Sequence, residues 1–574
     1  MVKDLLGLLE TDDPSAALTA VILSALDQQS HGLALSSVVG CLLDEEEVSG
    51  YLDPLAVLTQ LIPSTDPGVE GMLEVVRERC RPKEVMIACE ENLERVRRMV
   101  GDGDAEEWEW DGEEGEEGEE GEGKKKVSLS IQILRLIRMF TVISTIPLRR
   151  KSALSLSFIP ELAIVIQRVG GRAGAFTKTE GRDGLWYSAE LVERVVGLVE
   201  RWEERGEWKE ILVKYITTVI DTLGTHIQAS LAKRAFGMCF PKIGGPLDEG
   251  WERGEEVVSR LHSCFSRIGG VPGSVSSGFV LFAHGYLRGD WKWELGTYMP
   301  FIYSSIQTNT FLDESLAVLL FSFFPSHSHS LPPSSPTLSF LPLLSLLPAL
   351  SSTHPDPFIR HCAFRVLGGV LGVVPGLVQV EVLAELVERE GLGWKMRVAA
   401  IGLVKDAVLR ALERDRGGCS SGNENVMASP RFLQVFAPVL FVLKDFSGKD
   451  GEDLERDETV MELTRLGEVL GLYYVLVMRD TRNRTGIRDL DNRANFERRV
   501  LAPLRGLVPR WIGVVRGGLR KEEEVFREKV EEEKSHTSYA SEGLHSHSHA
   551  LAPLVSLQIG LERIDGMWEV IGGR

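Results

Sequence analysis

The chain has 574 residues, of which 43% are hydrophobic and 7% aromatic, and its formal charge at pH 7 is −20. This charge argues against a nucleic-acid-binding surface, which needs basic side chains to displace counterions from phosphates, and against binding to an anionic membrane. Leucine, valine and alanine dominate the apolar residues, so we expect an all-α protein that is too long for one compact core.

Residues 1–101 alternate apolar helical segments with turns. Asp12 and Asp13 form a natural N-cap region before the apolar stretch 14–29, and residues 67–80 and 82–99 are amphipathic. This pattern predicts an array of helical hairpins.

A Glu-Gly tract interrupts the helices. Residues 102–122 hold thirteen acidic side chains and are followed by three lysines at 124–126. Charge repulsion and the entropy of glycine oppose a packed core, so the tract predicts a disordered insertion. Trp108 and Trp110 would suit a docking peptide, but a solvated spacer is the favoured interpretation.

Helical patterns resume at residue 127. Residues 127–145 place apolar side chains all around the cylinder, which is typical of a helix buried on several sides. A Pro/Ser/His-rich stretch at 325–337 then predicts a second disordered interval. Between these two segments, further helices are expected at 185–203, 207–223, 225–238 and 251–268.

A weak repeat follows this interval. Asp356 to Arg360 are typical of the start of an inner HEAT-type helix, and residues 396–400 repeat the pattern thirty-seven positions later, with Ala363 in register with Ala400. Helix-pair solenoids have periods near 40 residues. The fold prediction is therefore a HEAT/ARM-like α-solenoid with disordered acidic and Ser/His-rich insertions.

The C-terminal part predicts helices at 431–443, 459–478, 494–515 and 550–571, with a charged helical extension at 520–534. The expected organisation is N-terminal repeats at 1–101, the acidic insertion at 102–126, middle repeats at 127–324, the Ser/His/Pro loop at 325–338, and C-terminal repeats at 339–574 with a disordered loop at 535–549.

No motif predicts catalysis, a cofactor or a metal site. Gly174 is followed by Ala175 and Phe176, which excludes a phosphate-binding P-loop. Residues 282–285 resemble the oxyanion strand of some hydrolases, but no Gly-x-Ser-x-Gly elbow supplies a nucleophile. A packed helix is favoured there, and an unrecognised hydrolase remains a remote alternative. Five histidines alternate with serine in the flexible loops without cysteine or acidic partners, which argues against metal binding: His327, His329, His545, His547 and His549.

The seven cysteines contain no CxxC pair, and the N-terminus lacks a signal-peptide pattern, so we expect a reducing, intracellular location. The most apolar runs, 316–324 and 340–350, are too short to cross a bilayer. Cys80 has basic neighbours that favour a reactive thiol, although an inert thiol is the favoured interpretation. Cys362 is expected to be buried.

The most informative segment is 472–504, LYYVLVMRDTRNRTGIRDLDNRANFERRVLAPL. It joins an apolar helix to a polar Thr-Gly turn and then to a basic helix that ends in Ala-Pro-Leu. Thr485 can cap a helix and Gly486 can adopt a positive φ, so the motif predicts a tight turn between helices.

The same region is locally basic in an otherwise acidic chain. Arginine is favoured at protein interfaces, so such a zone suits an acidic partner surface. The alternative, favoured by composition alone, is a solvated helix face whose arginines pair with Asp480, Asp489, Asp491 and Glu497. The arginines are Arg479, Arg482, Arg484, Arg488, Arg493, Arg498, Arg499, Arg505 and Arg510.

This segment resembles the closing part of the glomulin family, which also contains the plant aberrant lateral root formation protein and the fungal YAP-binding proteins. The match consists of the apolar helix 472–478, the turn Asn483-Arg484-Thr485-Gly486, and residues 501–504. Residues 551–571 also look like the terminal helix of these proteins. Arg488 departs from the aromatic or apolar residue that the family pattern expects.

The resemblance implies a non-enzymatic protein-binding adaptor. In the animal branch, the C-terminal repeats bind a RING-box protein and inhibit cullin-RING ubiquitin ligases, which is the first expectation here. In the yeast branch, the proteins bind a bZIP stress transcription factor and support its oxidation, which is the alternative. We expect a cytoplasmic location, with the nucleus as a second compartment, and a monomer outside its complex. The expected partner-binding residues are Arg482, Asn483, Arg484, Thr485, Gly486 and Arg505.

Overall fold

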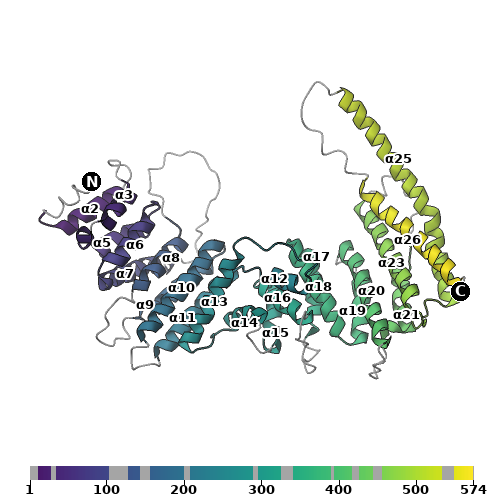
Figure 1. Cartoon of the computed structure of the whole chain (residues 1–574), viewed down its shortest axis with the longest axis horizontal. Coiled ribbons are helices and arrows are strands. Elements are labelled where there is room, and N and C mark those ends of the chain that lie inside the picture. Colours follow the sequence, from purple (N-terminus) through teal and green to yellow (C-terminus); the bar gives the residue numbers. More distant parts are fainter. Residues whose placement is uncertain are drawn as a thin grey trace. The chain divides into compact units, whose positions relative to one another are not determined.

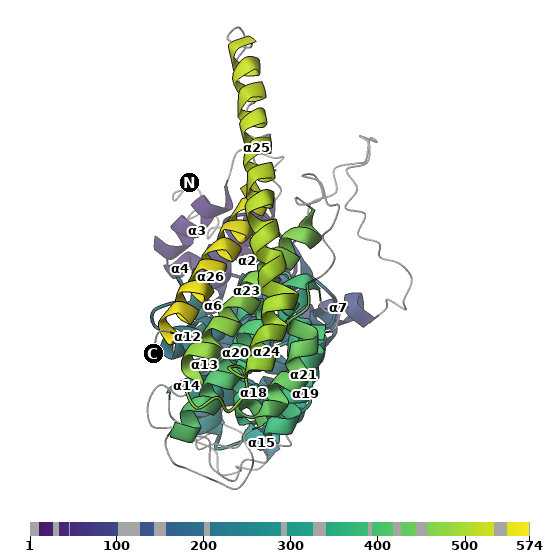
Figure 2. The ribbon, with the colours of Figure 1, turned by 90° about the vertical axis from the view of Figure 1, so that its right-hand side faces the viewer.

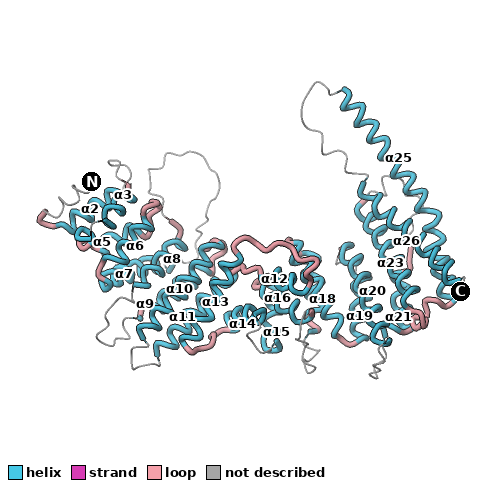
Figure 3. The backbone as a smooth tube through the Cα atoms, viewed as in Figure 1, coloured by secondary structure: helices cyan, strands magenta, loops and turns pink. Residues whose placement is uncertain are grey.

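The structure is a computed structural model, and every regular element that it describes is a helix (Figure 3). The all-α prediction is confirmed. None of the described helices combines the length and the apolarity of a membrane span. The described residues are 11–26, 34–44, 46–101, 127–142, 156–199, 207–288, 295–324, 340–388, 393–416, 426–443, 456–532 and 548–572.

The predicted insertions at 102–126 and 325–338 lie outside the described residues. Most of the predicted loop at 535–549 also lies outside them, but helix α26 begins at Ser548, so the last two residues of that loop are helical. The chain divides into two compact units, Met1–Val318 and Leu319–Arg574, and the division falls within α16 (Leu312–Phe323).

The first unit contains helices of four to twenty-two residues (Figure 1). Before α16 they are α2 (Pro14–Leu26), α3 (Leu35–Asp44), α4 (Glu46–Ser49), α5 (Pro54–Leu61), α6 (Val69–Arg79), α7 (Pro82–Gly101), α8 (Leu129–Phe140), α9 (Phe158–Gly170), α10 (Lys178–Val199), α11 (Glu207–Leu223), α12 (Leu231–Cys239), α13 (Trp251–Ile268), α14 (Val275–Arg288) and α15 (Leu295–Thr308).

Helix α8 is the predicted buried helix, and it packs against α7, α9 and α10. Its buried side chains include Arg135, whose guanidinium donates hydrogen bonds to the carbonyl oxygens of Ile62 and Ser64, each at 2.8 Å. The same side chain pairs with Glu70 at 2.8 Å. An apolar helix therefore carries one buried arginine because the end of α5 leaves carbonyl groups without helical partners.

Two predicted boundaries in this unit are wrong. Helix α10 begins at Lys178 instead of 185, because Thr177 and Glu180 form a capping box in which each side chain accepts a hydrogen bond from the other's backbone N–H. The helix predicted at 225–238 starts only at Leu231, since Gln228 and Ser230 have positive φ angles of 45° and 49°. Residues with positive φ cannot continue a right-handed helix.

The second unit continues after α16 with helices of which some pack against the next helix in the chain. They are α17 (Leu343–Thr353), α18 (Pro357–Val373), α19 (Gly376–Glu388), α20 (Trp394–Arg416), α21 (Pro430–Leu440), α23 (Asp457–Arg479), α24 (Leu490–Phe496), α25 (Ala502–Glu532) and α26 (Ser548–Gly572).

The predicted repeat has a structural counterpart in this unit. Ala363 and Ala400 are both fully buried. Arg360 of α18 donates to the carbonyl oxygen of His354 after α17, at 2.6 Å, and Arg397 of α20 donates to that of Val387 near the end of α19, at 3.0 Å. Two arginines thirty-seven residues apart thus donate hydrogen bonds to carbonyl oxygens at the C-terminal end of the helix that precedes their own.

Helices α23, α25 and α26 form the C-terminal end of the second unit. In two views at right angles, α26 runs across both α23 and α25 (Figures 1 and 2). Between α24 and α25 the chain makes a π-helical turn, Glu497–Leu501. These elements position the Thr-Gly turn.

Candidate protein-binding site

The Thr-Gly turn is built around one buried carboxylate. Asp480 directly follows α23 and is 1% exposed. It accepts hydrogen bonds from the backbone N–H groups of Arg484 at 2.9 Å and Thr485 at 2.8 Å, and from the Thr485 hydroxyl at 2.7 Å. The residue type of Thr485 had suggested a helix cap, but Thr485 does not cap a helix. Its hydroxyl donates to Asp480, and Asp489 takes the N-cap position of α24.

Two residues of the turn have left-handed backbones, Asn483 with φ 53° and Gly486 with φ 77°. The predicted positive φ of Gly486 is confirmed. A Cβ atom on Gly486 would also lie 3.0 Å from Oδ2 of Asp489, which is a tight contact. Glycine is therefore required at this position by both backbone and space.

Polar side chains lock the turn from both sides. The Asn483 amide donates to Asp489 at 2.6 Å and accepts from the backbone N–H of Arg488 at 2.8 Å. The Arg488 guanidinium donates to the carbonyl oxygen of Val477 at 3.0 Å, close to the end of α23. The departure from the family pattern at residue 488 thus has a structural role, because the guanidinium satisfies a terminal helix carbonyl.

Arg505, which we expected to bind a partner, lies in intramolecular ion pairs. Its guanidinium contacts Glu497 and pairs with Asp565 of α26 at 2.5 Å. Hydrogen bonds to these two carboxylates raise the pKa of Arg505. Arg493 is also committed within the fold, with its guanidinium 3.9 Å from the ring centroid of Trp568. For these residues, the intramolecular interpretation of the basic zone applies.

Four other arginines of the zone are exposed. Within the described part of the chain their side chains make no hydrogen bond or ion pair, whereas Arg479 and Arg484 do have contacts. These four are Arg482, Arg498, Arg499 and Arg510. The basic zone is thus divided into structural arginines and arginines that remain available to a partner.

A cleft of about 370 Å³ lies between α21 and the Thr-Gly turn, and we call it the Thr-Gly cleft. Thr485 and Gly486 line it, whereas Arg482, Asn483, Arg484 and Arg505 do not. Its remaining lining comes from Pro430, Leu433, Gln434, Ala437, Pro438, Phe441, Ile487, Asp489, Asn492, Asn495, Phe496 and Arg499.

The floor of the Thr-Gly cleft is apolar and fixed. Phe496 stacks on Tyr473 of α23 with ring centroids 3.8 Å apart, and it meets Phe441 edge-on at 4.7 Å. Phe496 and Ile487 are almost fully buried. Aromatic pairs of this kind hold α24 against the ends of α21 and α23.

The rim of the cleft carries polar side chains that make no hydrogen bond or ion pair within the described residues. Gln434, Asn495 and Arg499 are exposed, and no hydrogen bond or ion pair involves their side chains in the described residues. A carboxamide offers both a donor and an acceptor, which matches a peptide backbone, and a guanidinium matches a carboxylate. Nothing in the sequence indicates that residues 430–441 face the turn, so the α21 side of the cleft was not predicted.

Other candidate groups do not form a reactive site. Burial, with Glu84 and Asp53 nearby, raises the pKa of the Cys80 thiol to about 12, so its basic neighbours in sequence do not activate it. Cys362 is fully buried, as expected. Residues 282–285 lie in α14, which is the packed helix that was favoured. In the described ranges, no group of three or more histidine, cysteine or acidic side chains is placed to hold a metal ion.

Comparison with known families agrees with the resemblance carried by residues 472–504. No curated protein matches the chain. Residues 297–540 match the model of a family described as "Uncharacterised protein family, YAP/Alf4/glomulin". This match contains α16 to α25, including the Thr-Gly turn. Residues 297–540 are therefore similar to the YAP/Alf4/glomulin family.

Proposed function

We propose that the chain is a non-enzymatic adaptor that binds another protein at the Thr-Gly cleft. The observation that carries this proposal is the cleft itself, where uncommitted polar groups, Gln434, Asn495 and Arg499, surround a rigid apolar floor. Such an arrangement, with a buried apolar centre and a polar rim, is characteristic of protein interfaces. The family match supports a protein-interaction role.

The proposed partner is a RING-box subunit of a cullin-RING ubiquitin ligase. The mechanism would be steric, since an adaptor seated on the RING domain covers the surface that a ubiquitin-conjugating enzyme needs. An apolar or aromatic side chain of the partner would occupy the floor of the cleft, and a carboxylate would pair with Arg499. No chemistry by the adaptor is required.

A bZIP stress transcription factor is the alternative partner, as in the yeast branch of the family. If that role includes peroxide-dependent thiol chemistry, Cys80 is not a suitable residue, because its raised pKa disfavours the thiolate. Cys419 lies outside the described residues. The alternative is therefore tested through partner capture.

We also propose that the helix pairs of the second unit stack as a HEAT-like solenoid. The equivalent contacts of Arg360 and Arg397 support this arrangement for α17 to α20. We propose further that the protein works in the cytoplasm, with the nucleus as a second compartment, and that it is monomeric outside its complex. The net charge of −20 supports a role without nucleic acid or anionic membrane.

The test is capture of purified partners by the full chain. We expect the RING-box–cullin assembly to bind, and the Arg499→Glu variant to bind it at least about tenfold more weakly, because a repulsive charge would replace an attractive one. Arg516→Glu is the matched control, since Arg516 is also an exposed arginine on this part of the chain and lies outside the cleft.

Three outcomes would count against parts of the proposal. Unchanged affinity in a folded Arg499→Glu variant would remove the Thr-Gly cleft as the site. Capture of a bZIP factor in place of the RING-box–cullin assembly would establish the alternative partner. Failure to capture either protein would reject both partners.

A further inference from the structure

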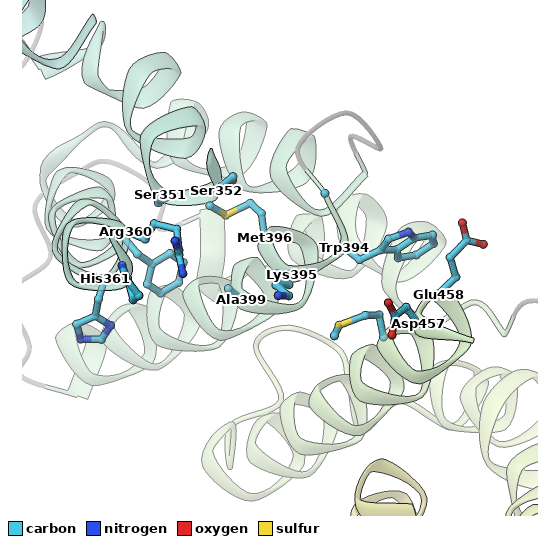
Figure 4. Close-up of a pocket in the computed structure, with 14 residues that line it drawn as sticks. Ser351, Ser352, Arg360, His361, Trp394, Lys395, Met396, Ala399, Asp457 and Glu458 are labelled. Carbon is cyan, nitrogen blue, oxygen red and sulfur yellow. The ribbon is translucent and has the colours of Figure 1, made fainter. Parts of the chain in front are cut away.

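A second pocket of about 660 Å³ lies elsewhere in the second unit, among α17, α18, α20 and the first turns of α23 (Figure 4). It shares no lining residue with the Thr-Gly cleft. Its walls come from helices that belong to different pairs. The proposed function makes no use of it.

The floor of this pocket is apolar and adaptable. Met396 is buried, and Phe364, Ala399 and Met461 are half-buried around it. Methionine side chains have several rotatable bonds and a polarizable sulfur, so they adjust to differently shaped apolar groups. Such a floor suits a large aliphatic or aromatic side chain better than a compact polar molecule.

The rim carries opposite charges that do not neutralise each other. Lys395, Asp457 and Glu458 are exposed, and none of them makes an ion pair or hydrogen bond within the described residues. Figure 4 shows the Trp394 ring on the side of Asp457 and Glu458, with Lys395 between these carboxylates and Arg360. In the described part of the chain, no cation pairs with the carboxylates of Asp457 and Glu458 at this end of the pocket.

Of the other basic side chains in the lining, Arg360 already donates hydrogen bonds to backbone carbonyl oxygens, and His361 has a lowered pKa. Arg360 donates to the carbonyl oxygens of His354 at 2.6 Å and Pro355 at 2.9 Å. Burial and the charge of Arg365 lower the pKa of His361, which disfavours a positive charge on its imidazole. The acidic end is thus the part of the pocket that most needs a partner charge.

The tryptophan beside these carboxylates strengthens the preference for a cation. The Arg397 guanidinium already lies 4.7 Å from the Trp394 ring centroid, which fixes the position of the indole. An indole next to two carboxylates suits a guanidinium, which can stack on an aromatic surface and donate several hydrogen bonds at once. A lysine would gain the charge attraction but not the planar, multidentate contact.

We propose that this pocket binds a short segment of a partner protein in which arginine follows a large apolar side chain. The apolar side chain would lie on Met396 and Met461, and the guanidinium would lie between Trp394 and the carboxylates of Asp457 and Glu458. This inference rests on the proposed protein-binding function and adds a site with the opposite charge preference to that of the Thr-Gly cleft.

Two fluorescein-labelled peptides test the proposal by fluorescence polarisation with the full chain. They are identical twelve-residue peptides except for a central Leu-Leu-Arg-Arg in one and Leu-Leu-Glu-Glu in the other. We expect the arginine peptide to bind at least about tenfold more tightly. The Asp457→Lys/Glu458→Lys variant should reverse this preference, and Met461→Ala should weaken the arginine peptide without changing its advantage over the other.

The matched control is Glu207→Lys/Glu252→Lys, which changes the charge by the same amount at exposed first-turn acids of α11 and α13. It should keep the wild-type preference. Equal binding of the two peptides, no binding of either, or an unchanged preference in a folded Asp457→Lys/Glu458→Lys variant would overturn the proposal. The peptide assay does not involve the RING-box–cullin assembly, so failure here is distinguishable from failure of the proposed function.

Discussion

At the scale of single residues, the Thr-Gly turn depends on a few side chains with specific backbone demands. Asp480 gathers three donors, and Gly486 combines a φ of 77° with a close approach to Asp489. Neither role is interchangeable with that of an ordinary loop residue. The position of the Thr-Gly cleft relative to α23 follows from these contacts.

Replacement of Gly486 by alanine should destabilise the second unit by about 1–2 kcal/mol, because an L-residue in the left-handed region carries that cost. The matched control is Gly506→Ala, since Gly506 is a helical residue of α25 with open space around its Cβ position. The control should be neutral or slightly stabilising. Urea unfolding followed by tryptophan fluorescence compares the two, and equal stability of the variants would contradict the role assigned to Gly486.

The first unit contains a buried ionic cluster that should respond to pH. His284 lies 3.0 Å from Glu255 and 3.9 Å from Glu314, while Arg234 and Arg288 approach Glu255 at 2.6 and 3.4 Å. Burial lowers the pKa of His284, but hydrogen bonds and charge from the two glutamates outweigh it and raise the pKa above its ordinary value. Burial alone would raise the pKa of Glu255, yet its cationic neighbours lower it to about 2.

The sign of each contribution to stability follows from these shifts. Because its pKa is raised, His284 stabilises the fold fully below pH 6.5 and loses this effect as the pH rises through its pKa in the folded state. Because its pKa is lowered, Glu255 stabilises the fold above pH 4.5 and loses this effect as the pH falls toward about 2. The contribution of neighbouring Asp313 has the opposite sign to that of Glu255, because burial raises the pKa of Asp313 to about 6.

We therefore expect His284→Gln to lower the unfolding free energy more at pH 5.5 than at pH 8.5. The loss should shrink with rising pH because the wild-type imidazole then becomes neutral. Urea unfolding at several pH values measures the difference. The unfolding free energy of a Glu255→Gln/His284→Gln variant should depend on pH much less than that of the wild type. A loss of unfolding free energy in His284→Gln that is the same at every pH would argue against the charged pair.

At the scale of elements, buried and half-buried arginines connect one helix to the end of another. Arg465 of α23 donates to the carbonyl oxygens of Leu440 at 3.1 Å and Val442 at 2.8 Å, and it pairs with buried Glu462 at 2.7 Å. Arg135, Arg360 and Arg397 make similar contacts elsewhere. These contacts satisfy the carbonyl groups that every helix leaves unpaired at its C-terminus.

Arg465→Met should destabilise the second unit by about 3–5 kcal/mol, since it leaves the Glu462 carboxylate buried without its counter-charge. The double variant Glu462→Gln/Arg465→Met removes that uncompensated charge and should recover part of the loss. Denaturant unfolding of the single and double variants measures both effects. A double variant that is less stable than Arg465→Met would show that the unpaired carboxylate is not the main cost.

The sequence predicted the helices well but their connections poorly. Amphipathic patterns identified most helices because burial of apolar faces determines them. The break at Gln228 and Ser230 was missed, since positive φ angles at these residue types leave no clear sequence signal. Arg505 was assigned to a partner, but its ion pair with Asp565 joins residues sixty positions apart, which a local pattern cannot reveal.

At the scale of the whole molecule, the two binding surfaces that we propose lie in the second unit and would have opposite charge preferences. Arg499 lines the Thr-Gly cleft and would pair with a carboxylate, whereas Asp457 and Glu458 line the pocket at Trp394 and would attract a cation. A partner that satisfies both must carry an acidic and a basic segment. This requirement would provide specificity beyond what either contact gives alone.

Amide hydrogen exchange of the full chain, with and without the RING-box–cullin assembly, tests the central claim most directly. If the partner occupies the Thr-Gly cleft, amides in residues 430–441 and 483–499 should exchange more slowly in the complex, because the partner excludes water and restrains opening of these elements. Unchanged exchange in both segments, with a stable complex present, would contradict the claim.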